Sequence, residues 1–305
     1  MLKEEILKLK KERNAIILAH NYQVPEVQDI ADFVGDSLEL SRKASQVDAN
    51  VIVFCGVKFM AETAKILNPD KKVLIPDLDA GCSLADSINL EQLRKWKSEH
   101  PNAIVVCYIN TNADIKTECD YCCTSSNAIR VIQSIPEDKE ILFLPDMYLG
   151  MWIKKQTGRE NIHIWPGECH VHAGFRYEDL LRKMEENPDA EVMLHPECGC
   201  TTQCLYHFNG NVKVLSTSGM IRNAKESKSN KFIVVTETGI LYPLKKASPQ
   251  KEFIPADENA ICKYMKMITL EKVFLSLKEL KYEIDLSSEI IQKASIPIRR
   301  MLQIA

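Results

Sequence analysis

A pattern that occurs three times at nearly constant spacing constrains the fold of this 305-residue chain more than any other feature. In each third an apolar run ends in polar residues, a segment with hydroxyl groups follows, and a loop with a cysteine comes last. The polar landmarks are His20, Tyr108 and His195, the hydroxyl landmarks are Ser37, Ser125 and Ser218, and the cysteines are Cys82, Cys169 and Cys262. Landmarks of the first two thirds lie 87 or 88 residues apart, and the last third has about six extra residues before Ser218. This period predicts three similar units around a pseudo-threefold axis, with equivalent loops meeting at the axis.

Short runs of Val, Ile and Leu without polar alternation are typical of parallel strands that are buried on both faces. Helix-like segments separate these runs, and this order of elements predicts an α/β fold. The predicted strands are Ala15–Ala19, Val51–Cys55, Val73–Ile75, Ala103–Val106, Ile141–Leu144, Glu191–Leu194 and Phe232–Val235. We place the three α/β repeats at residues 1–101, 102–188 and 189–275, with a C-terminal helical segment at 276–305 that packs back on them. The absence of G-x-G-x-x-G and P-loop motifs argues against classical nucleotide sites.

Composition and charge narrow the class of protein. The chain is 45% hydrophobic and 27% charged, as in soluble globular proteins, and its net charge is −3. It has no basic stripe with interleaved aromatic residues, so we expect no nucleic-acid partner. The first 13 residues lack the apolar core of a signal peptide, and no apolar run approaches the roughly 18 residues of a membrane span. We therefore expect a cytoplasmic protein that does not contact membranes.

The eleven cysteines need another explanation than disulfides, which are disfavoured in the cytoplasm. Cys55 and Cys107 lie in apolar runs and are expected to be core residues. Two groups, Cys119, Cys122 and Cys123 and then Cys198, Cys200 and Cys204, have no standard four-ligand spacing, and whether they bind a small zinc site or second cluster stays open.

One cysteine remains in each third, and the repeat brings these three loops to one axis. A cubane iron–sulfur cluster has a threefold axis through one iron, so three thiolates can hold three irons and leave the fourth open. An open coordination position is typical of a catalytic metal. Soft thiolate ligands suit an iron–sulfur cluster or zinc, and zinc held by three thiolates is the competing interpretation.

The hydroxyl segments resemble helix starts. Residues 36–39 have the sequence of a capping box, and 124–127 and 217–219 also resemble the first turns of helices. A helix N-terminus binds carboxylate or phosphate, although a single serine there more often serves as a simple cap. Three at equivalent positions predict a substrate with several anionic groups.

Several titratable residues lie near these landmarks. Each of His20, His172 and His195 is either a donor to substrate anions and proton shuttle or a structural hydrogen-bonding residue. The candidate acid–base groups at strand ends are Glu197, Tyr22 and Tyr108. His163 and His207 have no such candidate residues near them in the sequence, and we expect neither to belong to the site.

Several longer motifs resemble one known family. They are A-H-N-Y-Q at 19–23, G-D-S at 35–37, F-M-A-E at 59–62, G-C-S-L-A-D at 81–86, W-P-G-E-C-H-V-H at 165–172 and H-P-E-C at 195–198. Together they resemble quinolinate synthase, the A protein of de novo NAD biosynthesis, and the similarity extends over nearly the whole chain. The resemblance implies three pseudo-symmetric three-layer α/β/α domains around a central [4Fe–4S] cluster, whose three ligands match Cys82, Cys169 and Cys262. It implies the condensation of iminoaspartate with dihydroxyacetone phosphate to quinolinate, phosphate and water, and a functional link to an aspartate oxidase or dehydrogenase.

The resemblance also implies roles for single residues. The open iron would act as a Lewis acid in dehydration, and Glu197 and Tyr22 would move protons, with His20, His195 and Tyr108 as further catalytic groups. The positions that match substrate contacts are His20, Ser37, Tyr108, Asn110, Ser125, His172, His195, Glu197, Thr217 and Ser218. Two other classes compete with this interpretation: a zinc-dependent lyase or aldolase, and a non-catalytic iron–sulfur sensor.

Overall fold

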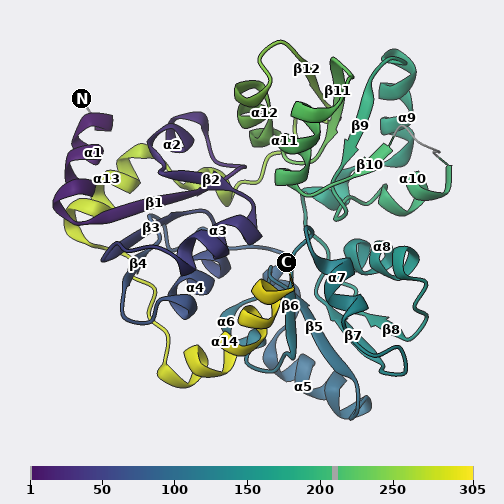
Figure 1. The fold of residues 1–305 in the computed structure, drawn as a ribbon, viewed down its shortest axis with the longest axis horizontal. Coiled ribbons are helices and arrows are strands. Elements are labelled where there is room, and N and C mark those ends of the chain that lie inside the picture. The colour runs from purple at the N-terminus through teal and green to yellow at the C-terminus, as the bar shows by residue number, and fades with distance from the viewer. Residues whose placement is uncertain (1, 208–211, 305) are drawn as a thin grey trace.

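The computed structural model describes residues 2–207 and 212–304, and it contains three four-stranded parallel sheets (Figure 1). The first sheet holds β1 (Ala15–His20), β2 (Phe33–Gly35), β3 (Val51–Cys55) and β4 (Lys72–Leu74). The second holds β5 (Ile104–Tyr108), β6 (Tyr121–Cys123), β7 (Ile141–Leu144) and β8 (Ile162–Ile164). The third holds β9 (Glu191–Leu194), β10 (Val212–Val214), β11 (Lys231–Val235) and β12 (Glu252–Pro255). The strand orders, β2-β1-β3-β4, β6-β5-β7-β8 and β10-β9-β11-β12, are equivalent, so the predicted threefold repeat of an α/β fold is confirmed.

The two central strands of every sheet coincide with runs that the sequence predicts. These strands are largely buried, which explains their continuous apolar character. The strands missed by the sequence prediction all lie at sheet edges and are β2, β6, β8, β10 and β12. Four of them have three residues each, and so short a segment gives no measurable periodicity.

Helices connect the strands within each sheet. The connecting helices are α2 (Pro25–Ile30), α3 (Ser37–Ser45) and α4 (Lys58–Leu67) in the first repeat, α6 (Ala113–Lys116), α7 (Ala128–Gln133) and α8 (Met147–Thr157) in the second, and α10 (Thr201–His207), α11 (Thr217–Glu226) and α12 (Leu241–Ala247) in the third. The N-terminal helix α1 (Leu2–Glu12) precedes β1 and buries Ile6. The parallel strands of each sheet are therefore joined by the crossover connections that such sheets require.

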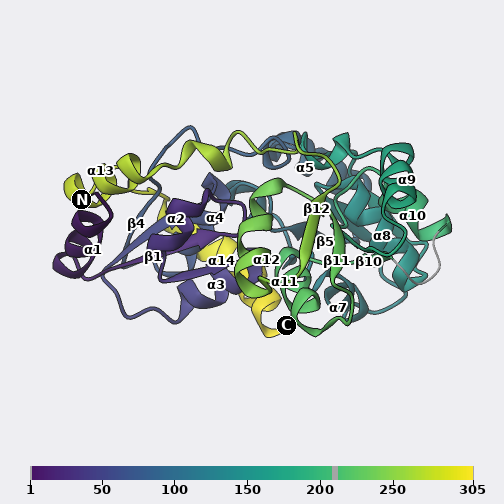
Figure 2. The same cartoon turned by 90° about the horizontal axis from the view of Figure 1, so that it is seen from above.

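The helix that follows each sheet packs on the next repeat. The three are α5 (Leu90–Glu99), α9 (Tyr177–Glu186) and α13 (Leu270–Glu279). Helix α5 contacts α6 of the second repeat, α9 contacts α10 of the third, and α13 returns to contact α1 and β3 of the first. Figures 1 and 2 show α13 beside α1 at the N-terminal end of the molecule. These connections close the three repeats into a ring.

The last helix, α14 (Ser288–Gln303), packs against α4 of the first repeat and against α6 and β6 of the second. The side-chain amide of Asn127 donates to the carbonyl oxygen of Met301 at 3.1 Å. Among the residues that the structure describes, no helix has both the length and the apolar character of a membrane span.

Side chains from the three repeats meet through hydrogen bonds at the start of α3. The Ser126 hydroxyl donates to the Asp36 carboxylate at 2.7 Å, and the Ser216 hydroxyl donates to the same oxygen at 3.1 Å. The other oxygen of Asp36 accepts from the backbone N–H groups of Leu38 and Glu39, which completes the predicted capping box. One carboxylate therefore caps a helix and joins three repeats.

We expect Asp36→Ala to lower the free energy of unfolding by about 2–3 kcal/mol, because the change removes a helix cap and leaves buried hydroxyl groups without their acceptor. The control is Asn89→Ala, since Asn89 forms an exposed capping box at the start of α5 and contributes about 1 kcal/mol. Urea unfolding of both variants measures the difference. Equal losses would show that the bonds between repeats contribute nothing.

Candidate active site

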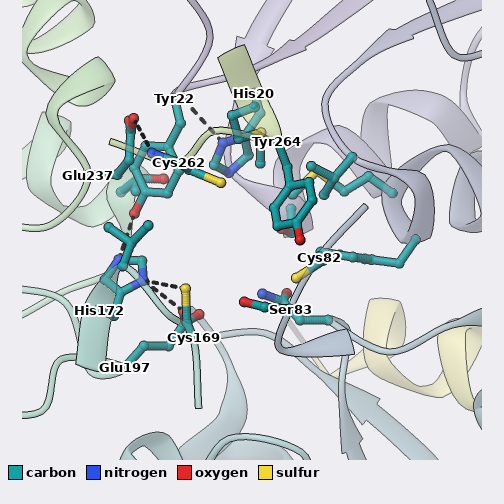
Figure 3. Close-up of a pocket in the computed structure, with 18 of the residues that line it drawn as sticks. His20, Tyr22, Cys82, Ser83, Cys169, His172, Glu197, Glu237, Cys262 and Tyr264 are labelled. Carbon is teal, nitrogen blue, oxygen red and sulfur yellow. Dashed lines mark hydrogen bonds and ion pairs between the residues drawn. The ribbon is translucent and has the colours of Figure 1, made fainter. Parts of the chain in front are cut away.

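A cavity of about 70 Å³ lies where the three repeats meet, at the carboxyl ends of the central strands (Figure 3). In α/β sheets this edge is the usual place for ligands. Of the residues predicted for the site, all except Ser218 line the cavity: His20, Tyr22, Ser37, Cys82, Tyr108, Asn110, Ser125, Cys169, His172, His195, Glu197, Thr217 and Cys262. Ser218 instead donates to the Glu39 carboxylate and accepts from the backbone N–H of Asp36, so it joins α11 to α3.

The three cysteine loops have the same local geometry. A 3-10 helix begins three residues after each cysteine, in η1 (Ala85–Ser87), η2 (His172–Gly174) and η4 (Met265–Met267). The carbonyl oxygens of Cys82, Cys169 and Cys262 each accept from the backbone N–H four residues later, at 3.0, 2.9 and 3.2 Å. Figure 3 shows the three sulfur atoms directed into the cavity. The loops therefore present equivalent thiols from three directions.

The thiols affect one another's ionisation. Burial is the main cause that raises the pKa of Cys82, to about 12, and the neighbouring Cys262 raises it further. Burial also raises the pKa of Cys169, and Cys82 adds to that effect. Backbone N–H groups that follow Cys82 and Cys262 donate to their sulfur atoms and oppose the rise. Such N–H donors stabilise a thiolate, which is the form that binds metals.

Glu197 is the centre of a buried hydrogen-bond network. Its carboxylate lies 3.2 Å from Nδ1 of His172 and accepts from the hydroxyl of Tyr108. Burial would raise the pKa of Glu197, but His172, His195 and Tyr108 outweigh it and lower the pKa to about 2. Burial would lower the pKa of His172, but Cys169 and Glu197 raise it to about 10. The two residues therefore form an ion pair inside the cavity.

Tyr22 extends this network on its other side. The Tyr22 hydroxyl contacts the Thr236 hydroxyl, which lies 2.9 Å from Nε2 of His172. Burial raises the pKa of Tyr22 well above its usual value, and Glu197 adds to the rise. The phenol therefore stays protonated and can donate a proton to a bound molecule.

His20 and His195 are held in the neutral form. Burial is the main cause that lowers the pKa of each to about 4. Two buried polar atoms of the cavity, Nδ1 of His195 and Oδ1 of Asn110, have no hydrogen-bond partner among the described residues. Because an unpaired buried polar atom costs free energy, both are expected to bind a ligand group.

The structure corrects one of the predicted helix starts. Ser37 and Thr217 open helices α3 and α11, as predicted. Residues 124–127, however, form a turn, and α7 begins only at Ala128. Asn127 stabilises this turn, because its side-chain oxygen accepts from the backbone N–H of Thr124 at 2.8 Å. Ser125 therefore faces the cavity from a turn, without the dipole of a longer helix.

None of the surplus cysteines lines the cavity. Cys107 and Cys122 are paired across β5 and β6, with their sulfur atoms 3.3 Å apart. The groups of three potential ligands that the described residues bring within 4.8 Å of one another include Cys169, His172 and Glu197, but none of the surplus cysteines. Whether these two groups of cysteines bind a metal therefore stays open.

Three residues of the site have no counterpart in the sequence prediction: Thr236, Glu237 and Lys266. The Glu237 carboxylate accepts from the backbone N–H of Cys262 at 3.1 Å and pairs with the Lys266 ammonium at 2.8 Å. Lys266 also donates to the carbonyl oxygen of Tyr22. Glu237 thus positions the third cysteine loop against the strand end that carries Tyr22. The predicted strand Phe232–Val235 ends just before Thr236, and the polar residues after this strand end could have indicated Thr236 and Glu237 as site residues.

We expect acid to destabilise the protein partly through His20. Its native pKa of about 4 lies below the 6.5 of an exposed histidine, so the unfolded chain binds more protons between these values. Stability is complete above pH 6.5 and falls as the pH falls toward 4, by about 2 kcal/mol per such histidine at pH 5. His20→Asn should therefore flatten the dependence of the unfolding midpoint on pH. The control is the exposed His207→Asn, and equal slopes in both variants would contradict the assignment.

Comparison with known proteins shows the family of the chain. The family model described as Quinolinate synthetase A protein matches residues 4–303. The chain belongs to this family. A quinolinate synthase of Pyrobaculum aerophilum is 54% identical over 308 residues and covers all of both chains. One of Thermus thermophilus is 54% identical over 99% of this chain and 97% of its own, and one of a Mycobacterium species is 51% identical over 98% and 91%.

Membership of the quinolinate synthetase A family makes the chain an enzyme. The identity extends over all three repeats, so the similarity includes every segment that lines the cavity. The expectation that the motifs around Cys82, Cys169 and His195 belong to this family is confirmed.

Proposed function

We propose that this enzyme condenses iminoaspartate with dihydroxyacetone phosphate to quinolinate, phosphate and two waters, as a step of de novo NAD biosynthesis. The observation that carries the proposal is one cavity that combines three thiols from three repeats with a buried set of acid–base groups. One carbon–carbon and one carbon–nitrogen bond close the new ring, and the atoms balance when phosphate and two waters leave. Iminoaspartate must come from an enzyme that oxidises aspartate, either an oxidase or a dehydrogenase.

The donor set of the cavity fits a [4Fe–4S] cluster held by Cys82, Cys169 and Cys262. All three sulfur atoms face one space, and thiolates are the ligands that such clusters use. The N–H groups directed at Cys82 and Cys262 favour the thiolate form. When bound, a cluster with three protein ligands supplies an open iron that acts as a Lewis acid toward a departing oxygen.

The protein's own residues would bind the anionic substrates. Iminoaspartate has two carboxylates and the triose has a phosphate, and Ser37 and Thr217 lie in the first turns of α3 and α11, where backbone N–H groups bind such anions. Neutral His20 and His195 and the amide of Asn110 can hydrogen-bond to carboxylate or carbonyl oxygens. Ser125 adds a hydroxyl from the turn before α7.

Proton transfer is proposed for the network around Glu197. The Glu197 carboxylate is ionised and close to the reacting space, so it can accept a proton from substrate carbon or nitrogen. Tyr22 and Tyr108 stay protonated and can donate. His172 keeps the carboxylate oriented by its ion pair. The burial of these groups excludes water from the reactive imine.

A zinc-dependent lyase is the second candidate, because Cys169, His172 and Glu197 also form a group with ligand atoms within 4.8 Å of one another. Mixed sulfur, nitrogen and oxygen ligands are typical of zinc.

The eleven cysteines are all free, which fits our proposal that the enzyme works in the reducing cytoplasm.

An anaerobic turnover assay tests the proposal. Protein reconstituted with iron and sulfide should form quinolinate from iminoaspartate and dihydroxyacetone phosphate, with one phosphate released per quinolinate. Zinc-loaded protein from the same preparation should form none. Activity of the zinc form alone would favour the lyase, and no quinolinate from either form would overturn both the substrates and the cofactor.

A further inference from the structure

A second group of metal-ligating side chains lies in the second repeat: His100, Glu140 and His163. Nδ1 of His100 lies 3.3 Å from one carboxylate oxygen of Glu140, and Nε2 of His163 lies 3.6 Å from the other. The imidazole rings are in contact, with centroids 4.4 Å apart and planes tilted by 41°. All three ligand atoms lie within 4.8 Å of one another. His163, which the sequence leaves without neighbours of this kind, thus lies beside two further potential ligands.

The spacing of the three atoms is suited to a shared ion. Nitrogen and oxygen ligands lie about 2.0–2.2 Å from zinc in a tetrahedral site, so two ligands are about 3.3–3.6 Å apart. The two nitrogen–oxygen distances, 3.3 and 3.6 Å, have similar lengths but involve different oxygens of Glu140, so the carboxylate would turn to bring one oxygen near both nitrogens. Nε2 of His163 is also buried and has no hydrogen-bond partner among the described residues. This nitrogen has no hydrogen bond and its nearest acidic group is the Glu140 oxygen at 3.6 Å, so a cation between the three groups would supply it with a partner.

The group is separate from the active-site cavity. His100 ends α5, Glu140 directly precedes β7, and the backbone N–H of Ile104 at the start of β5 donates to the carbonyl oxygen of Glu140. These are the amino ends of the central strands, whereas the cavity lies at their carboxyl ends. None of the three residues lines the cavity.

We propose that His100, Glu140 and His163 bind one divalent transition-metal ion of the zinc class. Two imidazoles and a carboxylate are a common zinc donor set, and they leave a fourth position for water. The side chains are 24%, 49% and 39% exposed, so an ion and its water ligand can enter from solvent. No other residue is required.

The ion would have a structural role. Helix α5 follows the Cys82 loop of the first repeat and packs on the second. Its other contacts to the second repeat include the ion pairs of Arg94 and Lys97 with Glu118. An ion held by His100, Glu140 and His163 would fasten the C-terminal end of α5 to β7 and β8. It would thereby stabilise the connection between the first two repeats.

Equilibrium dialysis against Zn²⁺ under anaerobic conditions tests the proposal. Wild type is compared with His100→Gln, Glu140→Gln and His163→Gln, and the exposed His207→Gln is the matched control. All variants keep the same cysteines, so zinc bound by thiols cancels in the comparison. Each of the three variants should bind one ion fewer per chain than wild type and the control. Loss of an outer-shell partner already weakens binding 10–100-fold, so loss of a ligand should weaken it at least about 100-fold.

A stability measurement gives an independent readout. Zn²⁺ should raise the unfolding midpoint of wild type and His207→Gln, and it should not raise that of His163→Gln, because only a site in the native state couples binding to folding. Equal zinc stoichiometry in wild type and the three variants, or an equal shift of the midpoint, would overturn the proposal. The group would then be an ordinary hydrogen-bonded ion pair. Neither outcome depends on the reaction at the active site.

Discussion

Changing any one of Cys82, Cys169 and Cys262 to serine should abolish quinolinate formation and cluster binding together. Each loop contributes one sulfur atom to the cavity, and no other cysteine of the described chain lines it. A cluster with two thiolate ligands has lost a third of its protein ligands, and serine is a poor substitute for a soft thiolate. Iron, sulfide and visible absorbance of the reconstituted variants measure the cluster, and the anaerobic assay measures turnover.

The control for this series is Cys55→Ser. Cys55 is completely buried at the end of β3 and lies outside the cavity lining, so the variant tests whether loss of any buried cysteine has the same effect. We expect it to keep its cluster and most of its activity, with lower stability because a buried thiol becomes a hydroxyl. If one of the three site variants kept a complete cluster, that cysteine would not be a ligand.

Glu197→Gln should lower kcat/KM by about 10²–10⁴-fold while the cluster stays intact, because general acid–base catalysis typically contributes this much. Glutamine has nearly the same shape and can still accept the hydrogen bond from Tyr108. It cannot take up a proton at pH 7, and it leaves His172 without its negative partner. Steady-state kinetics with iron analysis of the same sample separates loss of chemistry from loss of cofactor.

The matched control is Glu258→Gln, which removes a carboxylate from an exposed position in the third cysteine loop. Its kinetics should be those of wild type. Full turnover in Glu197→Gln with an intact cluster would exclude the acid–base role and leave the residue a structural partner of His172.

The fold could be predicted from the sequence where burial is continuous. The central strands, such as Val51–Cys55, have unbroken apolar runs because their side chains are buried on both faces of the sheet. The edge strands, such as Tyr121–Cys123, are too short for a period. Cys122 and Cys123 lie in this strand, although the sequence left open whether they and Cys119 bind a metal. The domain boundaries at 101, 188 and 275 stay predictions. The helix that follows each sheet is assigned to one repeat by these boundaries but packs on the following repeat.

The site could be predicted as far as the repeat marks it. The polar residues at the end of the first strand of each repeat, His20, Tyr108 and His195, recur at regular spacing and could be predicted. The second central strand also ends at the cavity, so Glu237 lines it and Thr236 contacts two lining residues, Tyr22 and His172. The group of His100, Glu140 and His163 could not be predicted from the sequence. His100 and His163 lie 63 residues apart and meet only when α5 packs on the second sheet.

Mössbauer spectroscopy of the enzyme reconstituted with ⁵⁷Fe tests most directly the claim that three cysteines, one from each repeat, hold a cluster with an open iron. We predict iron signals in a ratio of about 3:1, with only the minor signal shifting when substrate binds, because three irons have thiolate ligands and one is free to bind oxygen. Four equivalent irons that do not respond to substrate, or a thiolate site that binds zinc without sulfide, would contradict it.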